Sequence, residues 1–151
     1  MIALLWKCKL NNNFFMTPPL KNVWLIDDDK IFQFTAAMIL ESTGLTKTVH
    51  TFLNGKEAMN FLTDSKTNQK AQLPDIIFLD INMPVMNGWE FIEEFQQFSG
   101  TQSQPIKIYL VSSSVDESDI IESKKYPSIT DYVIKPLNRN KCCQLLSGQV
   151  E

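Results

Sequence analysis

Residues 76–80, Ile76-Ile77-Phe78-Leu79-Asp80, form a continuous apolar run that ends abruptly in an aspartate. A strand that is buried on both faces, as in a parallel sheet covered by helices, has this pattern. Pro84 and the Asn87-Gly88 pair then predict a loop, and apolar residues recur at helical spacing over residues 89–98. The stretch therefore predicts a buried strand, a loop and a helix, with Asp80 at the carboxyl end of the strand.

The same alternation extends to both ends of the chain. Apolar residues at helical spacing, including Ile31, Phe34 and Met38, predict a helix that ends near Gly44. Asn54 is a suitable N-cap for a second helix. We expect the other strands at residues 23–26, 49–52, 106–111 and 132–134, a polar loop at 64–74, and the other helices at 116–125 and 137–146.

Strand and helix thus alternate five times, which favours the α/β class with a parallel sheet and helices on both faces. The length of 151 residues suits one domain. We assign residues 21–151 to this domain and residues 1–20 to an N-terminal extension that is disordered or loosely docked. Met16 is an alternative start for the chain, in which case part of the extension is an artefact.

Charge and apolar runs exclude two classes of partner. The formal net charge is −3 and no basic stripe is present, so we expect no direct binding of nucleic acid. No apolar run approaches the roughly 20 residues of a membrane span. The N-terminus lacks the charge order and apolar length of a signal peptide. We therefore expect a cytoplasmic protein.

Polar groups with useful chemistry stand where four of the five predicted strands end: Asp27 and Asp28, Asp80, Ser112, and Lys135. The carboxyl ends of parallel strands meet at one edge, where open α/β sheets bind their ligands. Clustered carboxylates repel one another, and Mg²⁺ would relieve this repulsion. An aspartate is a competent nucleophile toward phosphorus, and a lysine ammonium can pair with a phosphate oxygen.

Each of these residues also has an ordinary structural interpretation. The aspartates after the first strand could form a solvated turn that caps a helix, and Asp80 could form an Asx-turn before Pro84. Ser112 could cap the next helix, and Lys135 could be a surface lysine. Their joint placement at successive strand ends favours a shared site.

Four segments, in this order, resemble the receiver domain of bacterial two-component response regulators: residues 23–29, 76–88, 109–113 and 131–136. The Asp-x-Asn-Met-Pro-x-Met-x-Gly stretch from Asp80 is the most specific of them. The resemblance covers residues 22–147 and implies a flavodoxin-like, doubly wound (βα)5 fold with strand order 2-1-3-4-5. A weaker similarity points to single-domain regulators that are paired with phytochrome-type kinases.

The resemblance also implies a role for each site residue. Asp80 would accept the phosphoryl group. Asp27, Asp28, Asp80 and the backbone carbonyl of Asn82 would hold Mg²⁺. Ser112 and Lys135 would bind phosphoryl oxygens, with a cis bond between Lys135 and Pro136. Tyr132 would turn inward with Ser112 as the switch, and Asn82 and Ser114 would tune dephosphorylation.

The implied donor is a sensor histidine kinase or a histidine phosphotransfer protein. The downstream target is unknown, and a homodimer is a further possibility. Only five residues follow Leu146, too few for an output domain, so we expect the signal to pass through protein contacts. His50 has neither a dimerisation helix nor a Gly-rich ATP lid around it, so the chain is not expected to be the kinase, or an enzyme with an external substrate.

Three alternatives stay open at this point. A magnesium-dependent aspartyl phosphatase usually carries Asp-x-Asp, and Asn82 occupies its second position here. A receiver-like docking module that is never phosphorylated usually lacks an acidic residue, the acceptor or the lysine, and all of these are present. A flavodoxin-like FMN binder would need a Ser/Thr/Gly-rich loop after the first strand, and Asp27 to Asp29 stand there instead.

Overall fold

The computed structural model describes residues 19–67, 73–99 and 105–148. Strands and helices alternate throughout, as the apolar pattern predicts. Their bounds are β1 Lys21–Ile26, α1 Lys30–Ser42, β2 Thr46–Phe52, α2 Gly55–Thr67, β3 Ile76–Asp80, α3 Gly88–Ser99, β4 Lys107–Ser112, α4 Glu117–Ser123, β5 Ile129–Ile134 and α5 Arg139–Ser147. Most of the N-terminal extension expected at residues 1–20 lies outside the described residues.

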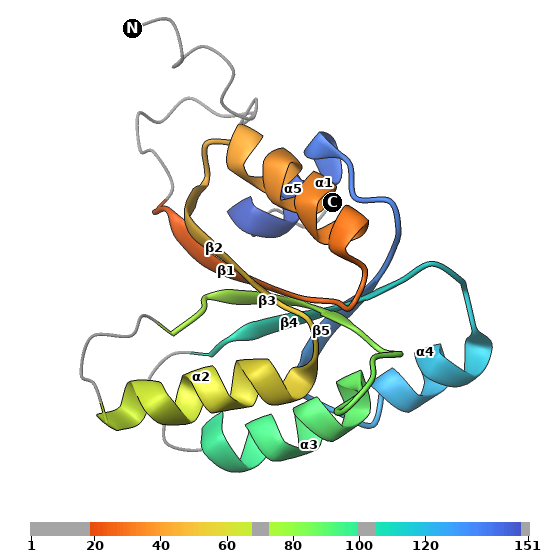
Figure 1. The fold of residues 1–151 in the computed structure, drawn as a ribbon. Coiled ribbons are helices and arrows are strands. Elements are labelled where there is room, and N and C mark those ends of the chain that lie inside the picture. Colours follow the sequence, from red (N-terminus) through yellow and green to blue (C-terminus); the bar gives the residue numbers. More distant parts are fainter. Residues whose placement is uncertain (1–18, 68–72, 100–104, 149–151) are drawn as a thin grey trace, which may run out of the picture.

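The five strands form one parallel sheet in the order β2-β1-β3-β4-β5. Helices α1 and α5 cover one face, and α2, α3 and α4 cover the other (Figure 1). The α/β class and the strand order 2-1-3-4-5 are therefore confirmed. The chain crosses from one side of β1 to the other between β2 and β3, so the carboxyl ends of β1 and β3 lie next to each other at the switch point of the sheet.

Successive side chains of the central strands point to opposite faces and fill two separate cores. In β1, Trp24 and Ile26 pack with α2 and α3, whereas Val23 and Leu25 pack with α1 and α5. All four are fully buried. Burial on both faces explains why β1 and β3 are continuous apolar runs that stop only where the strand reaches the polar edge.

The two edge strands begin earlier than predicted. β2 starts at Thr46 and β5 at Ile129, three residues before the predicted starts in each case. Edge strands are partly exposed, and their first residues are largely polar, so the apolar run marks only their last part. Helix α2 also continues to Thr67, so the predicted loop at residues 64–74 was wrong for residues 64–67; residues 68–72 lie outside the described part of the chain.

Helix α1 was predicted correctly, but the apolar residues that revealed it do not face the core. Ile31, Phe34 and Met38 are 79%, 68% and 56% exposed. A second set at helical spacing, Gln33, Ala36 and Leu40, is buried instead. The helix ends as expected, because Gly44 adopts a φ of 68°, in the left-handed region that glycine tolerates best.

Side chains cap the N-termini of α2 and α3 in similar ways. Asn54 Oδ1 accepts from the Glu57 N–H at 3.0 Å, while Glu57 accepts from the Leu53 N–H at 2.9 Å. At α3 the pair is fully reciprocal: the Asn87 N–H donates to Glu90 at 2.9 Å, and the Glu90 N–H donates to Asn87 Oδ1 at 2.9 Å. The predicted cap at Asn54 is confirmed, and these capping boxes fix where both loops enter their helices.

Candidate functional site

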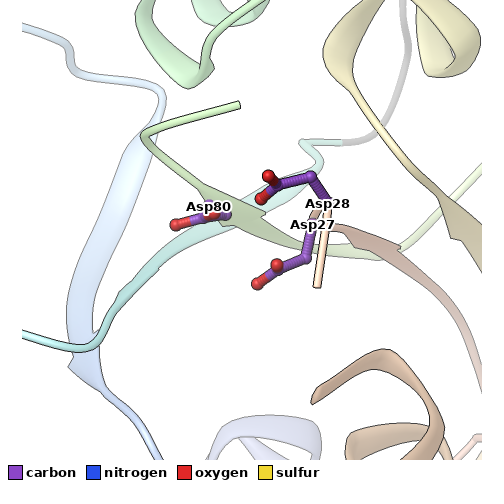
Figure 2. Close-up of side chains that lie close together, drawn as sticks. All are labelled: Asp27, Asp28 and Asp80. Atoms are coloured by element: carbon purple, nitrogen blue, oxygen red, sulfur yellow. The ribbon is translucent and has the colours of Figure 1, made fainter. Parts of the chain in front are cut away.

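Three carboxylates converge at the carboxyl edge of the sheet (Figure 2). Asp27 and Asp28 follow β1 directly, and Asp80 ends the neighbouring strand β3. One oxygen atom of each carboxylate lies within 4.8 Å of the other two. Asp27 is buried, Asp28 is exposed, and Asp80 is intermediate. The predicted meeting of these strand ends is therefore present in the structure.

Both oxygens of the Asp27 carboxylate have partners within the chain. Oδ1 accepts from the Asp29 N–H at 2.9 Å, and Oδ2 accepts from the Lys135 ammonium at 2.6 Å. The Asp27 N–H donates to the Phe52 carbonyl at 3.0 Å. These contacts hold the buried carboxylate in one orientation and supply the partner that a buried charge requires.

Lys135 reaches the site from the end of β5. Its N–H donates to the Ser112 carbonyl at 2.8 Å, and its bond to Pro136 is cis, as expected. Its Nζ lies 3.9 Å from Asp80 Oδ1 and 4.2 Å from the centre of the Phe32 ring. Two carboxylates and one aromatic ring therefore surround the ammonium.

Asp80 has a perturbed acidity. Its pKa is raised from 3.8 to about 6, first by burial and then by the neighbouring negative charge of Asp27. The Lys135 ammonium and the Ile81 N–H, which donates to Oδ1 at 2.9 Å, lower the pKa and so offset part of this shift. Among the described residues no hydrogen bond reaches Oδ2, which leaves that oxygen of Asp80 open to a reaction partner.

The loop after Asp80 packs tightly against the end of β3. The Gly88 N–H donates to the Ile81 carbonyl at 2.8 Å. A Cβ on Gly88 would lie 2.6 Å from the Asp80 carbonyl oxygen, so only glycine fits there without movement of the backbone. Val85, in the same loop, has a φ of 70°, which is strained for a β-branched residue.

The remaining predicted residues surround this edge at different depths. Ser112 is 6% exposed, and its Oγ accepts from the Ser114 N–H at 3.3 Å. The hydroxyl of half-buried Tyr132 donates to the Ser114 carbonyl at 3.0 Å. Asn82 and Ser114 are exposed and follow the site strands by two residues. The strand-end residues therefore share one edge, with Tyr132 tied to the loop after β4.

The donor atoms at this edge fit a hard divalent cation. Mg²⁺ prefers oxygen ligands and keeps several waters, and three carboxylates of different exposure offer such oxygens close together. A cation there would also relieve the repulsion that raises the Asp80 pKa. The site can therefore hold a metal ion, a carboxylate nucleophile and a fixed positive charge together.

Sequence reasoning missed two residues beside the site, Phe32 and Gln33. Phe32 carries the ring under Lys135. Gln33 is buried, and its Nε2 donates to the carbonyls of Asp27 and Phe52 at 2.7 Å each. Their positions in the first turn after the aspartates place them near the strand ends, and the spacing Gln33, Ala36, Leu40 could have indicated the buried face.

Comparison with known proteins agrees with this geometry. A family model described as the response regulator receiver domain matches residues 23–147. The chain belongs to this receiver domain family. Receiver domains act in two-component signalling, where they partner with histidine kinases or phosphotransferases and are generally not enzymes with external substrates. Phosphorylation and Mg²⁺ are typical of the family.

Curated relatives of this receiver domain are longer proteins. It is 29% identical to the DNA-binding transcriptional regulator NtrC of Escherichia coli (strain K12), over 85% of this chain but 24% of the relative. The chain spans about a quarter of the length of the NtrC relatives. The similarity therefore concerns the receiver domain of these proteins.

Solved structures match over most of their own length. A two component response regulator from Cytophaga hutchinsonii is 30% identical, with a TM-score of 0.70, over 87% of this chain and 99% of that one. The phosphorylated cyanobacterial phytochrome response regulator RcpA is 28% identical, with a TM-score of 0.68, over 85% and 90% of the two chains. The similarity of this receiver domain to phytochrome-associated regulators is thus confirmed. Within the described residues, no helix combines the length and the apolar character needed to cross a bilayer.

Proposed function

We propose that this receiver domain accepts a phosphoryl group on Asp80 from a phosphohistidine, with Mg²⁺ held by Asp27, Asp28, Asp80 and the carbonyl of Asn82. One observation carries the proposal: a part-buried carboxylate with an open oxygen lies beside two further carboxylates and a lysine ammonium at one edge of the sheet. This is the set of groups that transfer of a phosphoryl group to an aspartate requires.

In the proposed reaction, Asp80 Oδ2 attacks the phosphorus atom, and the bond between phosphorus and the histidine nitrogen breaks. The electron pair of that bond returns to the imidazole, and the product on Asp80 is an acyl phosphate. A pKa of about 6 keeps the Asp80 carboxylate mostly ionised at neutral pH, so it is ready to attack. Bound Mg²⁺ would offset the negative charge of the incoming group.

Charge and hydrogen bonding would then redistribute around the new phosphoryl group. Lys135 would turn from Asp27 toward a phosphoryl oxygen, since its ammonium already lies 3.9 Å from Asp80 Oδ1. The Ser112 hydroxyl would donate to a phosphoryl oxygen. This would move the Ser112 Oγ away from the Ser114 N–H that now donates to it. Tyr132 would follow, because its hydroxyl bonds to the Ser114 carbonyl. The switch would be a population shift between these arrangements.

The residues proposed to control the lifetime of the acyl phosphate are Asn82 and Ser114. Both are exposed, and both stand two residues beyond a site strand end. We propose that they line the approach of water to Asp80. Larger or charged side chains there would block or orient that water. We therefore assign them to the tuning of dephosphorylation.

The exposed stripe of α1, formed by Ile31, Phe34 and Met38, is the proposed docking surface for the phosphohistidine donor. These residues occupy one helical face and are 56–79% exposed. The stripe begins in the turn that also carries Phe32, whose ring contacts Lys135. A donor helix lying on this stripe would bring its histidine to the mouth of the site.

Other parts of the proposal concern the whole molecule. We assign residues 21–151 to the receiver domain, with a cytoplasmic location, where a donor phosphorylated from ATP is available. Output is expected through protein contacts to an unidentified target, with a homodimer as one form of such a contact, and without direct binding of nucleic acid.

The test is incubation of the full chain with acetyl phosphate and Mg²⁺, read by intact mass. We expect a gain of one phosphoryl group in the wild type and no gain in Asp80→Asn. Omission of Mg²⁺, or Asp27→Asn, should slow the gain strongly. A folded wild-type chain that gains no phosphoryl group would reject the proposal and favour the docking module that is never phosphorylated.

A further inference from the structure

The Lys135 ammonium has a neighbour that carries no charge. Its Nζ lies over the Phe32 ring, 4.2 Å from the ring centre. The other neighbours are carboxylate oxygens, at 2.6 Å on Asp27 and 3.9 Å on Asp80. The ring approaches from α1, whereas both carboxylates belong to strand ends. The ammonium is thus contacted from a helix, α1, and from the ends of two strands, β1 and β3.

The ring offers a different kind of contact from the carboxylates. The face of an aromatic ring attracts a cation through its quadrupole, within about 6 Å of the centroid. This attraction is less directional than a hydrogen bond, so the ammonium can turn while it stays over the ring. A third carboxylate in the same place would hold Lys135 as well, but it would repel an incoming phosphoryl group.

The Phe32 ring has a rigid support. The Phe32 N–H donates to the N-cap residue Asp29 at 3.1 Å, and the ring packs against the core between the sheet and the α1–α5 layer. The next residue, Gln33, is tied to the carbonyls that end β1 and β2. The first turn of α1 is therefore fixed to the strand ends, and the ring keeps its place beside Lys135.

From this geometry we propose that Phe32 is a positioning residue for Lys135. Its ring keeps the ammonium at the site both when it binds Asp27 and when it turns to a phosphoryl oxygen on Asp80. The inference rests on the proposed function, since it assigns Phe32 a part in that reaction. Phe32 is proposed to act only through Lys135, and not as a ligand of the metal or of the phosphoryl group.

The contact itself can be tested in the metal-free protein by NMR. A ring facing Lys135 shifts the resonances of the lysine's terminal methylene protons upfield by its ring current. We expect this shift in the wild type and in Phe32→Tyr, which keeps the ring, and its loss in Phe32→Leu, which keeps apolar bulk. If Phe32→Leu does not fold, as judged by circular dichroism, Phe32→Met takes its place.

The consequence is tested by the rate of phosphorylation from acetyl phosphate and Mg²⁺. We expect Phe32→Leu to be about 3- to 10-fold slower than the wild type, and Phe32→Tyr to be close to it. In a Lys135→Gln background, Phe32→Leu should cause no further loss, because its target is gone.

The outcomes separate this inference from the proposed function. A wild-type chain that gains no phosphoryl group overturns both. If the wild type is phosphorylated, three results overturn the role of Phe32 alone: an unchanged rate in Phe32→Leu, an equal loss in the Lys135→Gln background, or a Lys135 resonance that does not depend on the ring. The role of Phe32 is supported if the phosphorylation rate falls in Phe32→Leu, stays near the wild-type rate in Phe32→Tyr, and does not fall further when Phe32→Leu is added to Lys135→Gln.

Discussion

The Lys135 ammonium lies 2.6 Å from Asp27 Oδ2 and 3.9 Å from Asp80 Oδ1. The lysine therefore forms its hydrogen bond with the buried acid at the end of β1, and it compensates Asp80 only at a distance. Burial and the charge of Asp27 outweigh that compensation, which is why the pKa of Asp80 is raised to about 6.

This raised pKa predicts an unusual dependence of stability on pH in the metal-free protein. Between pH 3.8 and about 6 the folded chain binds more protons at Asp80 than the unfolded chain. The free energy of unfolding therefore falls as the pH rises through this window, by up to about 3 kcal/mol. Asp80→Asn should lack this fall and be more stable than the wild type at pH 7.

Urea unfolding with a chelator present, at steps from pH 4 to pH 7, measures this effect. The difference between the wild type and Asp80→Asn isolates Asp80, because all other titrating groups are shared. Parallel curves for the two proteins would show that the Asp80 carboxyl is not destabilised by its surroundings. Added Mg²⁺ should reduce the difference at pH 7, since a bound cation favours the charged carboxylate.

Gly88→Ala should damage both stability and the site. The new Cβ would lie 2.6 Å from the Asp80 carbonyl oxygen and 3.0 Å from Ile81 Cα, so the backbone that carries Asp80 must move. We expect a loss of about 1–3 kcal/mol and slower phosphorylation. Gly44→Ala is the control: its positive φ predicts a loss of about 1–2 kcal/mol, with phosphorylation unchanged. Equal phosphorylation rates in the two variants would contradict the close approach at Gly88.

Gln33→Met should destabilise the chain although it places an apolar side chain at a buried position. The change removes two hydrogen bonds of 2.7 Å and leaves the carbonyls of Asp27 and Phe52 without the Nε2 donor. A loss of about 2–3 kcal/mol is expected from chemical denaturation. Gln97→Met, at an exposed position of α3, should stay within about 0.5 kcal/mol of the wild type. Equal effects of the two changes would mean that the Gln33 bonds do not matter.

Phe34→Ser should separate docking from chemistry. Phosphotransfer from a phosphohistidine donor that serves the wild type should slow about tenfold, because the variant loses an apolar contact of the α1 stripe. Phosphorylation by acetyl phosphate needs no docking and should not change. Ile121→Ser, at a 61% exposed position of α4 in the opposite layer, is the matched control (Figure 1). A normal rate from the donor in Phe34→Ser would exclude this stripe as its docking surface.

Val85→Asn should stabilise the chain. Val85 has a φ of 70° and is 81% exposed, so its side chain gains little burial in return for backbone strain. Asparagine tolerates this region, and we expect a gain of about 1 kcal/mol in the free energy of unfolding. Val115→Asn, at a position that is 60% exposed, is the control and should have little effect. No gain in Val85→Asn would show that this backbone conformation is not strained in solution.

The sequence correctly predicted those parts of the molecule where a local residue pattern is compatible with only one type of secondary structure. A continuous apolar run such as residues 76–79 suits a central parallel strand, and the rule that such strands end at one edge then brings Asp80 close to Asp27 and Asp28. The same rule placed Ser112 and Lys135 correctly, although more than a hundred residues separate Asp27 from Lys135.

The surroundings of the site could not be predicted in this way, because they depend on how α1 is rotated about its axis. Two sets of residues in α1 have helical spacing, and the more apolar one, with Ile31 and Phe34, faces solvent. The Gln33 side chain is buried where its Nε2 donates to the Asp27 and Phe52 carbonyls, and these two carbonyls come together only once β1 and β2 are paired. Phe32 then meets Lys135 as a consequence of the same rotation.

The polar residues that shorten the apparent length of β2 and β5 also bear on whether the sheet edges can pair with another molecule. An exposed sheet edge invites a strand from another molecule, and charged side chains oppose such pairing. Exposed Lys47 lies on β2 and exposed Asp131 on β5, the two outermost strands. Each edge therefore carries a charge that must lose its water before another chain can add to the sheet, and we expect this cost to oppose edge-to-edge aggregation.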